Sequence, residues 1–124
     1  MILDTNALSA FFDGDASLKA VLGKAVRISI PVIVLGEYRF GLLGSRMRKT
    51  IEPALDALQA TSDVLVIDTG TVRPYAKLRD RLKRAGTPIP SNDIWIAAIA
   101  TQHGLPILRN QGLLAEPIYA RSQG

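Results

Sequence analysis

Short apolar segments alternate with segments of helical period along the whole chain, and this alternation is the strongest constraint on the fold. We expect strands at 2–4, 27–30, 63–68 and 105–108, and helices at 6–12, 16–22, 31–43, 45–60, 69–85 and 93–103. Strands that alternate with helices form mostly parallel sheets with helices on both faces. The pattern therefore predicts an α/β domain with such a sheet.

The segment ISIPVIVLGEYRF, residues 28–40, is ambiguous because it could be one long strand. Proline cannot donate a hydrogen bond to a sheet, but it fits the first turn of a helix. We therefore predict a strand that ends near Ile30 and a helix from Pro31 to about Leu43. By the same reasoning, Pro53 is expected to kink or restart the helix 45–60.

Length and composition narrow the class of protein. A chain of 124 residues suffices for one domain with its own core, and a mean hydropathy of +0.18 is too high for a disordered chain. The absence of cysteine excludes disulfides and thiolate sites. Neither a signal-peptide pattern nor a membrane-spanning apolar run is present, so we expect a soluble, cytoplasmic protein. The net charge of +4 favours a polyanionic partner such as nucleic acid.

Three acids stand out by their place beside apolar segments. Asp4 ends the first strand, and sites in parallel sheets form at the carboxyl ends of strands. Glu37 lies within an apolar helical segment, but it can also be an exposed helix residue near Arg39. Asp93 opens the apolar segment 94–100, where it can act as a helix cap. Because the two residues before Asp93 already suit a cap, we place it at a buried edge.

Other polar residues have structural explanations. Asp68 is expected to cap the helix 69–85, and His103 lies at a helix C-terminus, where it would complement the helix dipole.

Three acids without cysteine or a second histidine suit a hard cation such as Mg²⁺ or Mn²⁺. Without a cation, converging carboxylates would repel each other.

Three segments together resemble the VapC-type toxins of the PIN-domain ribonuclease family. They are MILDTNALSA at 1–10, IPVIVLGEYRFGLLGS at 30–45 and GTPIPSNDIWIAAIATQHGLPIL at 86–108. The third is the most specific, and the resemblance covers roughly residues 1–107. It implies a three-layer α/β/α PIN-like domain with a mostly parallel central sheet. The chain would be a single domain, 1–124, whose tail after about residue 110 diverges from the family pattern.

The resemblance also implies a function: a Mg²⁺- or Mn²⁺-dependent endoribonuclease, the toxin of a type II toxin–antitoxin system, that hydrolyses RNA phosphodiester bonds. By position, Asp4, Glu37 and Asp93 would be the catalytic acids and metal ligands. Thr5 would orient Asp4 through its hydroxyl, and Asn92 would help shape the pocket. Family toxins are usually dimers held inactive by an antitoxin. The expected partners are therefore RNA, a VapB-type antitoxin and a second copy of the chain.

Two further surfaces are candidates for contacts with partners. The candidates for holding RNA phosphates are Arg46, Arg48, Lys49 and the basic residues from Lys77 to Arg84. A basic helix is, however, more often simply a solvated face. An antitoxin helix could cover apolar residues that the core could also accommodate, namely Leu8, Phe11, Phe12, Leu42 and Leu43.

The chain departs from the family pattern after its last strand. The family has a hydroxyl residue, a basic residue and a fourth acid there, whereas this chain has Leu108, Arg109 and Asn110. Asn110 is a possible weak fourth ligand, better placed than Glu116 in the tail, and fewer charged ligands weaken metal binding. Two interpretations stay open: a working nuclease, or an impaired homologue that binds RNA or an antitoxin without efficient cleavage.

A third interpretation comes from another class of protein. Phosphoacceptor receiver domains also place aspartates at strand ends, and VLVIDTG at 64–70 fits that pattern superficially. However, the chain lacks the paired acids after its first strand, and Arg109 takes the place of the late lysine.

Overall fold

A mostly parallel sheet forms the centre of the computed structural model, which describes residues 1–24, 27–108 and 114–115. Its strands are β1 (Ile2–Leu3), β2 (Ser29–Pro31), β3 (Asp63–Leu65), β4 (Ile107–Leu108) and β5 (Leu114–Ala115). Their order in the sheet is β3-β2-β1-β4-β5, with β5 antiparallel to β4 and all other pairs parallel. The predicted parallel sheet is confirmed.

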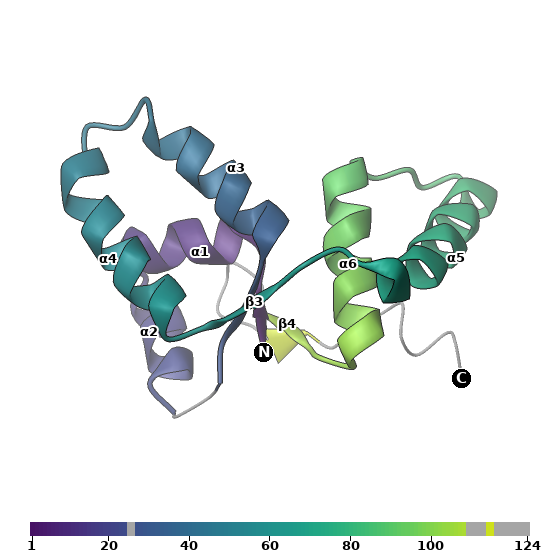
Figure 1. The fold of residues 1–124 in the computed structure, drawn as a ribbon, viewed down its shortest axis with the longest axis horizontal. Helices are drawn as coiled ribbons and strands as arrows, with labels where there is room; N and C mark the ends of the chain where they lie inside the picture. Colours follow the sequence, from purple (N-terminus) through teal and green to yellow (C-terminus); the bar gives the residue numbers. More distant parts are fainter. Residues whose placement is uncertain (25–26, 109–113, 116–124) are drawn as a thin grey trace.

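Helices cover both faces of this sheet, so the predicted α/β/α layering is confirmed (Figure 1). One side carries α1 (Thr5–Phe12), α2 (Ala16–Leu22), α3 (Val32–Leu42) and α4 (Arg48–Ala60). The other side carries α5 (Thr69–Ala85) and α6 (Ser91–His103). None of the helices within the described ranges is long and apolar enough to cross a bilayer.

The order of the strands reverses at β1, and this determines where a site can form. From β1 the chain proceeds through β2 to β3 in one direction, then crosses over to β4 on the other side of β1. Ligands of open α/β sheets bind outside the strand ends at such a switch point. Receiver domains have the order 2-1-3-4-5. The observed order differs, so the receiver-domain interpretation is wrong.

The apolar character of α6 is explained by its position between two clusters of buried residues. Ile96, Ile99 and Ala100 belong to the main core around the sheet. Ile94 and Ala98 pack on the other side with Leu78 of α5. A helix with two packed faces must be apolar nearly all round, whereas a surface helix needs only one such face.

The predicted boundaries of α3, α4 and β3 are among those that differ from the structure. Pro31 closes β2, where it pairs in register with Leu65, so α3 begins one residue later than expected. The helix predicted from Ser45 begins at Arg48, because the Ser45 hydroxyl accepts a hydrogen bond from the amide of Met47 and holds a turn there. That helix continues through Pro53 without a restart.

The third difference is the length of β3, which was expected to continue to residue 68. This strand lies at the edge of the sheet and has only β2 as a partner. Because β2 is three residues long, only three residues of β3 are paired. The apolar side chains of Val66 and Ile67, which follow the strand, are exposed.

The junction of α5 with α6 is closed by a small polar network around the predicted cap Asp68. Asp68 accepts from the amide of Gly70 at 2.9 Å, and its own amide donates to the Thr71 hydroxyl at 3.0 Å. Gln102 of α6 joins both residues: it accepts from Thr71 Oγ1 at 2.6 Å and donates to Asp68 Oδ1 at 2.8 Å. The Gln102 hydrogen bond is the main reason why the pKa of Asp68 lies below its usual value, followed by the Gly70 amide.

Replacing Thr71 by valine is expected to destabilise the protein by about 1–3 kcal/mol. The Thr71 side chain is fully buried, and valine keeps its shape but removes the hydroxyl, which would leave the Asp68 amide and the Gln102 carbonyl without their partner. Chemical denaturation measures the loss. Thr69→Val is the control, because Thr69 is exposed in the same turn and should change stability by less than about 0.5 kcal/mol. Equal effects of the two variants would contradict this account.

Candidate functional site

Asp4 lies at the carboxyl end of β1, where the sheet changes direction, and it also begins a helix. Its backbone is extended, and its Oδ1 accepts a hydrogen bond from the amide of Ala7 at 2.7 Å. Asp4 is therefore the N-cap of α1, which explains why a short strand runs directly into a helix at this point. The half-buried carboxylate is held at the strand end by the backbone of the next element.

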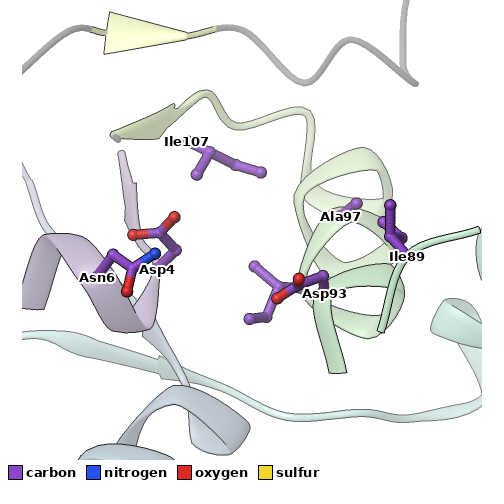
Figure 2. A pocket seen from close by; sticks show the side chains of 7 residues that line it. Asp4, Asn6, Ile89, Asp93, Ala97 and Ile107 are labelled. Atoms are coloured by element: carbon purple, nitrogen blue, oxygen red, sulfur yellow. The ribbon is translucent and has the colours of Figure 1, made fainter. Parts of the chain in front are cut away.

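Asp4 and Asp93 line the same open pocket of about 270 Å³. Figure 2 shows the two carboxyl groups on facing sides of this space, with Ile107 beside it. This acidic pocket is lined by Asp4, Asn6, Ile89, Asp93, Ile96, Ala97 and Ile107. Residues far apart in the chain thus meet between β1, β4 and α6.

Asp93 is exposed rather than at the buried edge expected from the sequence. The reason is that α6 begins two residues earlier than predicted, with Pro90 at the N-cap position and without a side-chain cap. Asp93 therefore occupies the first turn of α6, where the helix dipole favours a negative charge. The cap that was expected from Ser91 and Asn92 does not form, and both residues are exposed.

Glu37 lies in a neighbouring pocket of about 350 Å³, together with Thr5 and Tyr38. Thr5 Oγ1 donates to Glu37 Oε1 at 2.9 Å, so the hydroxyl that was expected to orient Asp4 is directed to Glu37. Thr5 directly follows Asp4 in the chain, and Asn6 lines both pockets. The first turn of α1 therefore connects the two pockets.

The three predicted acids do not form one cluster. Within residues 1–24, 27–108 and 114–115, no group of three or more Asp, Glu, His or Cys side chains could hold a single metal ion. Three polar side chains of the acidic pocket can nevertheless bind a metal ion, and each does so through oxygen. They are Asp4, Asp93 and the amide of Asn6. Mg²⁺ keeps several waters and binds proteins through one or two carboxylates, so this donor set fits such a cation.

Asn6 is a pocket residue that the sequence analysis did not single out, although it belongs to the first quoted segment. Its position two residues after the strand-end acid was the available signal. By contrast, Asn92 was predicted to shape the pocket, and it is not among the residues that line the acidic pocket. His103 is exposed at the C-terminal end of α6, as its predicted dipole role requires.

Most of the apolar residues considered for partner binding belong to the core. Leu8 and Leu42 are buried, and Phe11 and Phe12 pack against the main core. Leu43 is 60% exposed, and the exposed apolar residues in the same stretch include Phe40 and Met47. The candidate ligands Asn110 and Glu116 lie outside the described residues.

A family model described as "PIN domain" matches residues 1–112 of this chain. A curated relative, "Ribonuclease VapC5" of Mycobacterium tuberculosis, is 30% identical over 109 residues, which is 86% of this chain and 79% of that protein. The matched residues of the family model include the three predicted acids, Asp4, Glu37 and Asp93.

Solved structures show the same fold. VapBC2 from Rickettsia felis, bound to a DNA fragment from the promoter, matches with a TM-score of 0.77 and 26% identity over 88% of this chain and 85% of that one. FitAcB from Neisseria gonorrhoeae matches with a TM-score of 0.75 and 25% identity over 86% and 84%. Both likenesses extend over nearly the whole described chain.

Proposed function

Because the chain belongs to the PIN-domain family, we propose that it is a metal-dependent endoribonuclease and the toxin of a type II toxin–antitoxin system. The relative from M. tuberculosis is named a ribonuclease, and the structural neighbour from R. felis is a VapBC complex. These names favour a working nuclease over the impaired homologue. The proposed reaction is hydrolysis of RNA phosphodiester bonds.

The observation that carries the proposal is that Asp4 and Asp93 face each other across one pocket at the switch point of the sheet. We propose that both carboxylates bind Mg²⁺ or Mn²⁺. The cation would polarise a phosphoryl oxygen and lower the pKa of a bound water. Asp4 is held for this task by the Ala7 amide, and Asp93 by the first turn of α6. No residue of the chain needs to become covalently attached to the substrate.

Glu37 is proposed as the third catalytic acid, acting from the neighbouring pocket. Its carboxylate is fixed by Thr5 and retains one oxygen beyond that bond. Glu37 would therefore contribute negative charge and a hydrogen-bond acceptor for water at the rim of the site. We propose that Thr5 positions Glu37. Asn92 is exposed in the first turn of α6, and we propose that it contacts the substrate.

The proposed partners follow from the same relatives. A VapB-type antitoxin would bind the chain, since antitoxin complexes are among its structural neighbours. The exposed apolar residues of the α3–α4 region, Phe40, Leu43 and Met47, are suited to such a contact or to a homodimer. RNA, the proposed substrate, is a polyanion and suits the net positive charge of the chain. The proposed location of the protein is the cytoplasm.

The purified chain is expected to cleave a mixed RNA with Mg²⁺ or Mn²⁺ and to lose this activity in EDTA. Restoring the metal should restore cleavage, because the carboxylates alone supply no Lewis acid. Asp93→Asn should be strongly impaired. Asp56→Asn alters an exposed carboxylate of α4 that pairs with Arg39 of α3, and it should cleave like wild type. Gel assays of RNA fragments measure both comparisons. Full activity in EDTA, or no cleavage with either metal, would refute the proposed function.

A further inference from the structure

A second pocket adjoins the acidic pocket on the side of α5. It has a volume of about 400 Å³ and is called the basic pocket here. Its apolar part includes Leu82, Ile89 and Ile94, and its rim carries Arg79, Lys83 and Ser91. Ile89 lines both pockets, so a single side chain lies between the two spaces. A ligand that extends over Ile89 would occupy both.

The cations at the rim are not neutralised by carboxylates. On the basic helix α5, Arg84 pairs with Asp80, and within the described part of the chain neither Arg79 nor Lys83 takes part in an ion pair. Two positive charges therefore stand at the edge of an apolar hollow. This combination suits a ligand with a flat apolar part and a negative charge.

Arg79 is also held in place. Its guanidinium donates to the Tyr75 hydroxyl at 2.8 Å and lies 6.0 Å from the centre of the Tyr75 ring. Tyr75 in turn stacks on Trp95 of α6, with ring centres 3.7 Å apart and an angle of 15° between the planes. The stacked rings join α5 to α6, so the position of Arg79 is tied to the helix that carries Asp93. A fixed cation loses less conformational entropy on binding than a free one.

We propose that the basic pocket is a subsite for one nucleobase of the RNA chain, next to the bond that is cleaved. Arg79 and Lys83 bind the phosphate of that nucleotide, and Leu82, Ile89 and Ile94 contact the face of the base. This inference rests on the proposed ribonuclease function. It explains how RNA is positioned over the acids, since carboxylates alone would repel a polyanion. The occupant is single-stranded, because a base paired in a helix could not enter the pocket.

Binding is tested in EDTA, where RNA stays intact, by fluorescence anisotropy of a labelled single-stranded RNA. Lys83→Ala should weaken binding and lower the slope of log K against log salt by about 0.7, the contribution of one phosphate contact on a single strand. The control Lys19→Ala removes the same charge from exposed α2 and should leave the slope unchanged. An unchanged slope in Lys83→Ala would overturn the phosphate contact.

A second variant tests the base. Ser91→Phe fills the pocket from its exposed rim without changing charge, and it should weaken RNA binding by about tenfold. An abasic ribose-phosphate oligomer of the same length should bind this variant as it binds wild type. Equal weakening of both oligomers, or of neither, would overturn the nucleobase subsite, provided that thermal melts show Ser91→Phe folded. Because these assays need no cleavage, an inactive wild type would refute the proposed function without deciding the subsite.

Discussion

Asp4→Asn is expected to lower the rate of RNA cleavage by roughly 10²- to 10³-fold, the range seen when one preorganised electrostatic group is removed from an active site. The carboxylate is half of the pair that faces the acidic pocket. Asparagine retains the side-chain oxygen but not the charge. The loss should therefore remain in the cleavage rate at saturating metal, because additional cation does not restore the missing charge.

The same substitution is expected to leave folding almost unchanged. Asp4 caps α1 by accepting from the Ala7 amide, and asparagine caps helices as well as aspartate does. Asp4→Ala removes the cap too and should cost about 1 kcal/mol of stability. Thermal melts and cleavage rates of the two variants separate the cap from the chemistry. Wild-type cleavage by Asp4→Asn would contradict the catalytic assignment, and equal melting of the two variants would contradict the cap.

Leu108→Ser is expected to destabilise the protein by about 3–5 kcal/mol. Leu108 is fully buried in the main core, and on β4 it pairs in register with Leu3 of the central strand. Serine would leave a cavity and a buried hydroxyl. The family resemblance leads us to expect a hydroxyl residue at this position, but introducing one should harm this chain.

Leu108→Met is the matched control, since a swap that conserves volume usually costs less than about 1.5 kcal/mol. Urea denaturation followed by circular dichroism measures both variants. If Leu108→Ser were as stable as Leu108→Met, the side chain at residue 108 would not be part of the core. Cleavage measured well below the melting temperature should change little in Leu108→Met.

Local sequence patterns predicted the bounds of a helix or strand well where the residues at its ends favoured only one kind of structure. Helix α5 begins and ends at the predicted residues because Asp68 and Gly86 supply a cap at each end. The end of β2 was misjudged because Pro31 fits both the last position of a strand and the first turn of a helix. The prediction for β3 failed because its length depends on its partner strand rather than on its own residues.

The meeting of Asp4 and Asp93 at one pocket was expected from the sequence, but the contacts of the site residues were not. Asp4 and Asp93 follow from the strand-end rule and from the family resemblance, and the structure places both at one pocket. The Thr5–Glu37 hydrogen bond joins residues 32 positions apart, and no local pattern encodes it. The basic pocket was also invisible, because Lys83 on α5 and Ser91 on α6 become neighbours only when the two helices pack.

The central place of β1 determines when the pocket can exist during synthesis. Ile2 pairs with Ile107, so β1 must wait for β4, which is synthesised much later in the chain. Contacts between distant parts of a chain form late, and the ribosome adds only about 5–20 residues per second. Asp93 and Ile107 are synthesised long after Asp4, so a nascent chain lacks one wall of the acidic pocket until α6 and β4 have been made. The acidic pocket is therefore absent from a nascent chain that ends at α5.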